Sequence, residues 1–584
     1  MTRKTSKTRK ILAMAIGQTD QRTSRFRQDE DGAVVAFTLF VLVIMLIAGG
    51  VAVDVMRHEM ERARLQNTLD TAVLAAAGAP YGSKPKEIIE DYFAKAEMSS
   101  YLNAIDDDGE GGDDDIVQTV NTSKVSASAE MTMETYLMKL AGVSELTAAT
   151  ASSAERRVPK LEVSMVLDVS GSMGSNSKLT NLKNAGKKFV TTILDSSNLG
   201  DAVISVVPFS WDVSPGENII TSLNVDIRHD YSTCLQFTNA DFNSAAIDPA
   251  EEQIQLIYTS EYDYGLNKLN DVYRTCYNEP NAEILPYSIS ETDLHNKIDA
   301  LEAKGNTSGN MGMKWGAALL DPKFEDIKIA LNGKTVNGEK LVDDRVGKVP
   351  AAYNESETLK VIVMMGDGQN TYSNQFPLNS TFRGANSYLH YVEWDELEFD
   401  YAYNKYKSNK RKNDESYCTK NDWECEYTAV SHASYFLYDP DDDQYKNLST
   451  GERLQSSEFD DLLTSDGFVS HDQKTWEMAW GKMSPDFMDK ENDYNVAEAE
   501  FESYSNRVQG SEKDAQMGSI CTAIKNQGVV VYTIGFEVSN GGTAERELKK
   551  CATSEAHYYR ANGIDITDAF SSIASNVVNL RLTQ

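Results

Sequence analysis

Two carboxylates and a group of hydroxyls follow the expected strands of this chain, and together they suit the binding of a divalent cation. Asp168, Ser170 and Ser172 form the pattern Asp-x-Ser-x-Ser directly after the apolar run at residues 163–167. A second apolar run, residues 359–365, ends just before Asp367. Hard divalent cations prefer carboxylate and hydroxyl oxygens of this kind.

Thr307 supplies a further hydroxyl, in a loop that precedes a helical pattern at residues 311–320. In an open parallel sheet, the loops that follow the strands converge at one edge. We therefore predict a metal site made of Asp168, Ser170, Ser172, Thr307 and Asp367. For any one motif alone, the better interpretation is a helix cap that satisfies free backbone N–H groups. All three motifs in order favour the metal site.

Apolar strands alternate with amphipathic helices from residue 161 onward, and this alternation predicts a doubly wound α/β sheet. The expected strands are residues 161–169, 202–209, 359–365, 529–536 and 557–560, and the expected helices are residues 179–194, 294–303, 311–320, 544–550 and 566–580. Two long insertions interrupt the pattern, at about residues 211–290 and 370–514. Loops of this length are usually functional or form a subdomain. Because the second starts directly after Asp367, we expect a subdomain over the metal site.

An uncharged segment from Ala33 to Val53 predicts a membrane anchor, because its twenty-one residues match the hydrocarbon thickness of a bilayer when helical. The alternative is a cleaved signal peptide, but its apolar core usually runs only about 7–15 residues. Acid-rich sequence follows the segment, and basic residues precede it, which places the N-terminus in the cytoplasm. These basic residues are Arg3, Lys4, Lys7, Arg9, Lys10, Arg22, Arg25 and Arg27.

The chain therefore divides into four parts, whose boundaries we predict as residues 1–32, 33–55, 56–157 and 158–584. They are a basic cytoplasmic N-terminus, a transmembrane anchor, a small α+β module built on the continued anchor helix, and the doubly wound domain. In the module we expect a helix at residues 85–98 and strands at residues 123–136 and 147–154. The Asp- and Gly-rich stretch at residues 106–115 favours a solvated linker, because a Ca²⁺ loop needs fixed alternation and a terminal bidentate acid.

Charge and cysteine content limit the function and the compartment. The 584 residues include 89 acidic and 56 basic side chains, a net charge of -33, which argues against a nucleic-acid partner. The six cysteines fit an oxidising compartment and lack zinc-ligand spacing. Pairing of sequence neighbours is a hypothesis, since six cysteines allow 15 connectivities. The expected pairs are Cys234 with Cys276, Cys418 with Cys425, and Cys521 with Cys551.

The second insertion is acidic and rich in tyrosine and tryptophan. These side chains either pack a subdomain core or form a partner-binding surface, where Tyr and Trp are enriched. The acidic run at residues 439–443 is expected to be solvated surface rather than a second cation site. The aromatic residues are Tyr388, Tyr391, Trp394, Tyr401, Tyr403, Tyr406, Trp423 and Tyr427.

The order Asp-x-Ser-x-Ser, then Thr, then Asp resembles the metal-ion-dependent adhesion site (MIDAS) of von Willebrand factor A domains. The resemblance implies that Ser170, Ser172 and Thr307 are direct or near-direct ligands. It also implies that Asp168 and Asp367 bind directly or through water, and that the cation is Mg²⁺, with Mn²⁺ or Ca²⁺ as alternatives. The sequence departs from the family at Gly366, where many members carry Thr.

Segments at both ends of the chain resemble TadG-like proteins of the tight-adherence (Flp) pilus machinery. They are residues 32–37, 49–54, 65–72, 307–320, 521–525, 531–536, 550–552 and 580–583. The resemblance implies a single-pass protein of the Gram-negative inner membrane with a periplasmic von Willebrand A domain. Counting from Gly32, Phe37 stands where processed prepilins usually carry Glu. We therefore expect an anchored accessory protein rather than a polymerising pilin.

The residues and the resemblance together predict a cation-dependent binding and assembly protein. Its metal would accept an Asp or Glu carboxylate from a protein partner, a component of pilus assembly. The alternative is a surface-displayed, pilus-associated adhesin that uses the same site. An enzyme is not expected, because a nucleophilic serine needs a neighbouring base and none of the seven histidines stands in a recognisable catalytic motif.

Overall fold

The computed structural model describes residues 31–79, 83–106, 115–118, 122–157, 160–336, 338–355, 357–401 and 425–583. The chain splits into two compact units, Met1–Arg157 and Val158–Gln584. Several predictions lie outside the described residues: the basic N-terminal cluster, most of the Asp- and Gly-rich stretch, Cys418, Tyr403, Tyr406 and Trp423.

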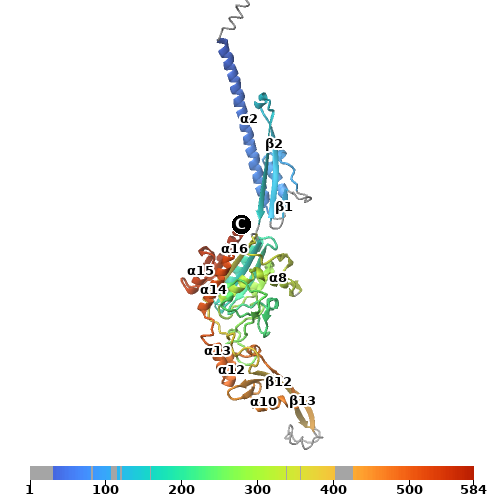
Figure 1. Ribbon diagram of the computed structural model, residues 1–584, viewed down its shortest axis with the longest axis vertical. Coiled ribbons are helices and arrows are strands. Elements are labelled where there is room, and N and C mark those ends of the chain that lie inside the picture. Colours follow the sequence, from blue (N-terminus) through green and yellow to red (C-terminus); the bar gives the residue numbers. More distant parts are fainter. Residues whose placement is uncertain are drawn as a thin grey trace, which may run out of the picture. The chain divides into compact units, whose positions relative to one another are not determined.

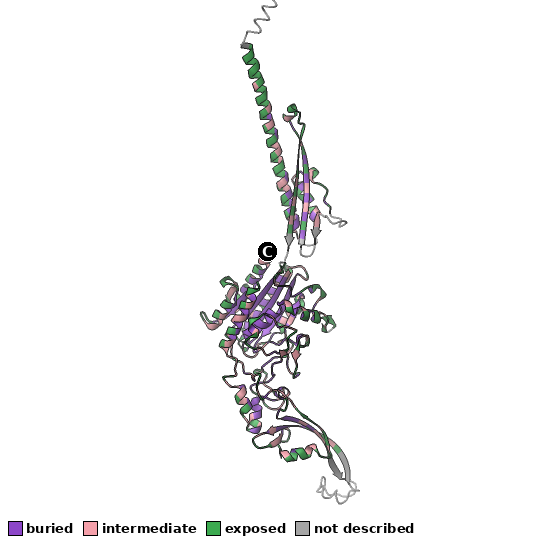
Figure 2. Cartoon of the chain, in the orientation of Figure 1, coloured by how far each residue is buried: buried purple, intermediate pink, exposed green. Residues whose placement is uncertain are grey.

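The first unit is built on one long helix, α2 (Asp31–Gly78), as predicted. Among the described residues, α2 supplies the one helix long and apolar enough to cross a membrane. Its first half is largely exposed, whereas its second half buries Leu65, Leu69 and Val73 (Figure 2). These side chains pack against the short helix α3 (Pro85–Lys95) and a small sheet.

That sheet has three antiparallel strands in the order β1-β2-β3: β1 (Ile116–Gln118), β2 (Thr122–Glu134) and β3 (Glu145–Arg157). Alternate residues of β2 face the helix, and Val125, Ala129 and Met131 are buried there. Small residues dominate both long strands, so the sheet can lie close to α2 (Figure 1).

The second unit contains a six-stranded sheet in the order β18-β17-β11-β4-β5-β8. Its strands are β4 (Lys160–Asp168), β5 (Ala202–Phe209), β8 (Leu285–Ser288), β11 (Thr358–Gly366), β17 (Val530–Phe536) and β18 (Tyr558–Ala561). Five strands are parallel and the edge strand β8 is antiparallel. Numbered along the chain, this is the order 3-2-1-4-5-6 of doubly wound sheets.

Helices cover both faces of this sheet, so its strands are buried on both sides, as uninterrupted apolar runs require. On one face lie α4 (Lys178–Asp195), α6 (Glu291–Ala300) and α16 (Ile566–Thr583). On the other lie α7 (Gly309–Ala318), α14 (Gly510–Asn526) and α15 (Thr543–Cys551). The predicted doubly wound α/β class is confirmed.

The elements that the sequence pattern did not predict include one strand and one helix beside the large sheet. Strand β8 has only four residues, includes Pro286, and pairs at Ile204↔Ser288 and Val206↔Leu285. Proline lacks an N–H, which restricts it to such edges. Helix α14 buries the polar side chains Lys513 and Gln516, which obscures its amphipathic pattern.

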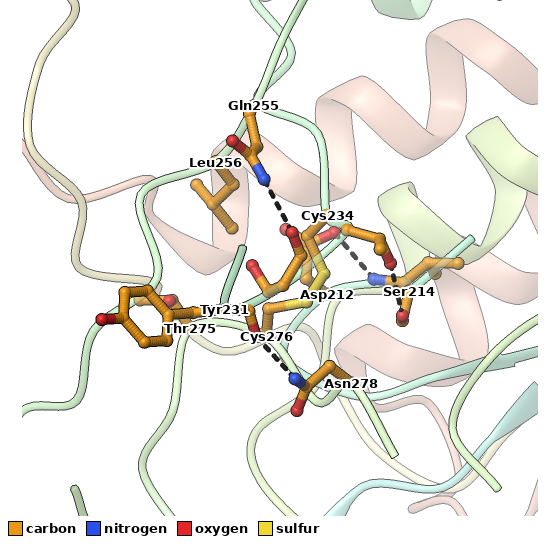
Figure 3. The surroundings of a disulfide bond; sticks show 12 residues. Asp212, Ser214, Tyr231, Cys234, Gln255, Leu256, Thr275, Cys276 and Asn278 are labelled. Carbon is orange, nitrogen blue, oxygen red and sulfur yellow. Dashed lines mark hydrogen bonds between the residues drawn. A yellow bond between two sulfur atoms is a disulfide. The ribbon is translucent and has the colours of Figure 1, made fainter. Parts of the chain in front are cut away.

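The first insertion is mostly irregular and is tied by the Cys234–Cys276 disulfide. Around this bond, the Gln255 side-chain amide donates to the carbonyls of His229 and Ser232. The Asn278 side-chain amide donates to the carbonyl of Tyr231 (Figure 3). The predicted pairs Cys234–Cys276 and Cys521–Cys551 are confirmed. The pairing of Cys418 with Cys425 stays a prediction.

The second insertion forms an antiparallel sheet in the order β15-β14-β13-β12-β16 (Figure 1). Its strands are β12 (Leu389–Tyr401), β13 (Cys425–Asp439), β14 (Gln444–Asn447), β15 (Arg453–Gln455) and β16 (Phe468–Gln473). Its helices are α10 (Ser456–Leu463), α11 (Trp476–Trp480), α12 (Pro485–Asn492) and α13 (Val496–Phe501). The predicted aromatics Tyr388 and Trp394 pack within it, against Trp476 and Phe436 respectively.

Candidate metal centre

The candidate site lies where the order of the sheet reverses. Strands β4 and β11 are the first and fourth of the sheet along the chain, yet they are neighbours. In doubly wound sheets, ligands bind beyond the carboxyl ends of strands at such a switch point. Asp168 is the last residue of β4, and Asp367 follows the last residue of β11. Parallel pairing therefore brings the two carboxylates together although 199 positions separate them.

The Asp-x-Ser-x-Ser turn folds back on itself at this edge. The backbone N–H of Ser170 donates to Asp168 Oδ1 at 2.8 Å, which fixes the carboxylate across the turn. The hydroxyls of Ser170 and Ser172 lie 3.1 Å apart. Ser172 then donates to Asp367 Oδ1 at 2.7 Å. Four of the five predicted ligands thus form one hydrogen-bonded cluster.

Thr307 reaches the same place from a third loop. Its backbone loop is joined to the serine turn, because Gly171 N–H donates to Gly305 O at 2.8 Å and Lys304 N–H donates to Val169 O at 2.9 Å. Thr307 and Asp168 line one small cavity. Thr307 therefore shares this cavity with Asp168 and takes no part in the hydrogen bonds that join the other four residues.

Buried contacts on its C-terminal side hold the Thr307 loop in place. The Ser308 hydroxyl donates to Trp211 O at 2.5 Å and accepts from Lys513 Nζ at 2.6 Å. The start of the second insertion adds to this support, since Thr371 N–H donates to Thr307 O at 3.0 Å. Asn370 Oδ1 accepts the N–H of Gly309, the first residue of α7, at 2.7 Å.

The sequence analysis did not predict two further charged residues that lie at the cluster. Lys178, the first residue of α4, places Nζ 3.0 Å from Asp367 Oδ2 and 3.7 Å from Glu537 Oε2. Glu537 directly follows strand β17, so its position after the end of a strand could have predicted its place near the site. Lys178 had no such signal, because its approach to Asp367 depends on how α4 packs.

The charge balance and the donor chemistry of the cluster suit a hard divalent cation. Burial, together with the charge of Asp367, raises the pKa of Asp168, so a buried cation would stabilise its ionised form. Lys178 offers one positive charge, on the side of Asp367 opposite to the Ser172 hydroxyl. Among the described residues, no group of three or more His, Cys, Asp or Glu side chains has a metal-binding arrangement. Two carboxylates with hydroxyls are a set for Mg²⁺, Mn²⁺ or Ca²⁺ rather than zinc.

The departure at Gly366 has no steric cause in the structure. A Cβ atom there would lie 3.8 Å from Asp168 Oδ2 and 4.0 Å from Leu548, which are ordinary contacts. A side chain at this position would therefore begin in ordinary van der Waals contact with its neighbours.

Comparisons with known proteins support the N-terminal resemblance. Residues 32–79 match the family described as "Putative Flp pilus-assembly TadE/G-like", so the predicted likeness to TadG-like proteins is confirmed over this segment. No curated protein matches the chain.

Several of the solved structures that resemble the chain are pilus proteins. The vWF domain of the type V pili tip protein Mfa5 from Porphyromonas gingivalis shares 15% identity at a TM-score of 0.31, over 73% of this chain and 97% of that chain. The pilus adhesin SpaC from Lactobacillus rhamnosus GG shares 11% at 0.27, over 80% and 33%. The pilus adhesin RrgA from Streptococcus pneumoniae shares 11% at 0.28, over 79% and 48%. The chain thus spans less than half of both adhesins, and its fold is defined by its own strand order.

Proposed function

We propose that this chain, with its TadE/G-like segment and doubly wound domain, is a cation-dependent binding and assembly protein of a tight-adherence (Flp) pilus system. The observation that carries the proposal is the hydrogen-bonded cluster of Asp168, Ser170, Ser172 and Asp367 at the switch point of the sheet. The match at residues 32–79 supports the link to pilus assembly.

In this proposal Asp168, Ser170, Ser172, Thr307 and Asp367 hold Mg²⁺, or Mn²⁺ or Ca²⁺, directly or through water. When bound, the cation supplies a positive centre that can accept a carboxylate. Ser172 is exposed, while Ser170 and Asp168 are buried, so the cluster is open at Ser172 and closed beneath. A partner's Asp or Glu side chain would approach from the open side.

The protein's own residues prepare this site. The Ser170 N–H and the Ser172 hydroxyl orient the two carboxylates, and Lys178 holds the second oxygen of Asp367. The proposed activity is binding, because the described partners of the serine hydroxyls are acidic or hydroxyl groups, and no histidine lies among them.

We further propose that α2 anchors the protein in the inner membrane, with the N-terminus in the cytoplasm and the doubly wound domain in the periplasm. The alternative function, a surface-displayed adhesin, uses the same site against an external ligand. Fractionation separates the two, since the assembly protein stays with the inner membrane and the adhesin reaches the cell surface.

The experiment is a cation-dependent crosslinking pull-down from membranes that contain the full-length chain. We expect capture of a pilus component in Mg²⁺, loss of capture in EDTA, and recovery when Mg²⁺ is restored. Asp168→Ala should lose capture with an unchanged circular dichroism spectrum, whereas the exposed Asp230→Ala serves as the matched acidic control. Capture by Asp168→Ala at the wild-type level, in Mg²⁺ and in EDTA, would show the mechanism to be wrong.

A further inference from the structure

The tip of the β2–β3 hairpin is fastened to the anchor helix at the point where its apolar segment ends. Asp54 is the first charged residue after the uncharged run. Its Oδ2 accepts the N–H groups of Leu137 at 2.7 Å and Met138 at 2.8 Å, and its Oδ1 accepts that of Tyr136 at 3.2 Å. Three bonds to one carboxylate fix the height of the tip along the helix.

The tip reaches beyond Asp54, toward the apolar side of the helix. Gly50 is buried there, and a Cβ atom on it would lie 2.5 Å from Leu137 Cβ. Gly50 stands one helical turn, about 6 Å, further into the uncharged run than Asp54. Figure 1 shows the hairpin running along α2 and ending in the small turn that contains the short helix η2 (Met138–Ala141). The tip therefore lies level with the last turn of the apolar segment.

The side chains at this tip are apolar and face outward. Tyr136 is 70% exposed and Leu140 is 74% exposed, and Leu137 and Val143 add smaller exposed areas. The tip, residues 135–144, contains one lysine, Lys139, and no acid. By contrast, the strands carry the paired acids Glu134 and Glu145 where they meet the tip, because β2 ends at Glu134 and β3 begins at Glu145.

We propose that this tip is a second membrane contact, which inserts into the headgroup and outer acyl region of the bilayer beside the anchor. The proposal rests on the proposed anchoring of α2. A lipid surface is the occupant the structure favours, because the exposed apolar side chains are continuous with the apolar surface of α2 and lie at its edge. Tyrosine is enriched at membrane interfaces, and a lysine can extend its ammonium to the headgroups while its stem stays apolar.

Such a contact would have a mechanical consequence for the first unit. A single helix can tilt and rotate in a bilayer, but a helix joined to an inserted hairpin has two points of attachment. The sheet β1-β2-β3 would then keep a fixed orientation to the membrane surface. The three hydrogen bonds of Asp54 would transmit this constraint from the hairpin to the helix.

The test uses the full-length chain in vesicles of phosphatidylethanolamine and phosphatidylglycerol, with a nitroxide spin label on one introduced cysteine. Leu140→Cys and Val143→Cys report on the tip, Val43→Cys on the apolar segment, and Glu130→Cys on the exposed face of β2. Collision with oxygen, which concentrates in lipid, is compared with collision with a water-soluble nickel chelate. We expect the oxygen-to-nickel ratio at the tip labels to exceed that at residue 130 severalfold and to approach that at residue 43.

The controls separate this proposal from the anchoring on which it rests. A lipid-like ratio at residue 43 with water-like ratios at residues 140 and 143 would overturn the tip contact and leave the anchor intact. A water-like ratio at residue 43 would overturn the anchor itself, and the tip contact with it.

Discussion

At the scale of single residues, the main feature of the candidate site is a carboxylate, that of Asp168, in a buried position. Asp168 is fully buried at the end of a parallel strand, where its carboxylate accepts the backbone N–H groups of Ser170 and Asp367 and lies near the Asp367 carboxylate. A buried charge is costly unless it is paired. Lys178 pairs with Asp367, which leaves the serine side of the cluster as the place for a cation.

The first prediction concerns Ser172, which contributes a possible ligand oxygen and orients Asp367. We expect Ser172→Ala to lower Mn²⁺ affinity by about tenfold or more, since loss of an orienting partner alone costs about 10–100-fold at metal sites. Isothermal titration calorimetry or Mn²⁺ electron paramagnetic resonance measures the change. Ser175→Ala is the matched control, because Ser175 is exposed in the same loop. Equal Mn²⁺ affinity in both variants would contradict a ligand role for Ser172.

A second residue-scale prediction concerns the contact between the buried His390 and the exposed His471 in the second insertion. His390 Nδ1 lies 2.9 Å from His471 Nε2, and the His390 ring also packs against Tyr445 and Phe459. Burial, and then the like charge of His471, lowers the pKa of His390 to about 4. The unfolded chain therefore binds more protons than the folded one, so stability present above about pH 6.5 is lost as the pH falls toward 4.

The expected loss for His390 is at most about 3 kcal/mol across that window. Urea unfolding followed by the fluorescence of Trp476 and Trp480, which lie in the same subdomain, measures it at several pH values. His390→Phe should reduce the pH dependence of the free energy of unfolding. An unchanged slope between pH 6.5 and 4 in this variant would show that other groups carry the effect.

At the scale of elements, a glycine sets the path of the loop that brings Thr307 to the site. Gly305 has φ +71°, and a Cβ atom there would lie 2.5 Å from Tyr277 Oη. We expect Gly305→Ala to destabilise the domain by about 1–2 kcal/mol through backbone strain and to weaken Mn²⁺ binding by displacing the loop. Gly338→Ala is the control, because Gly338 has φ +86° but open space where a Cβ atom would lie, and it belongs to a distant hairpin. A metal affinity unchanged in Gly305→Ala would refute the coupling of this loop to the site.

The elements also show what sequence patterns can and cannot reveal. The strands around Asp168 and Asp367 are long apolar runs buried on both faces, so periodicity and the switch-point rule predicted them and the convergence of their ends. Strand β8 was missed because an edge strand of four residues carries almost no pattern. The contact of Lys178 with Asp367 and the packing of Phe376 on Trp480 join segments that are distant in the sequence. Local sequence patterns cannot predict such pairs.

At the scale of the whole molecule, each unit has its own hydrophobic core, which makes the site independent of the anchor. The cores on both faces of the large sheet are built from residues of the second unit alone. We therefore expect a fragment of residues 158–584 to fold without lipid and to bind Mn²⁺ as tightly as the full-length chain. Size-exclusion chromatography, thermal unfolding and calorimetry test this, with Asp168→Ala in the same fragment as the control for specific binding. A fragment of residues 31–157 should require detergent, because the first half of α2 leaves its apolar side chains exposed. Aggregation of the larger fragment, or binding no tighter than that of its Asp168→Ala form, would mean that the site depends on the first unit.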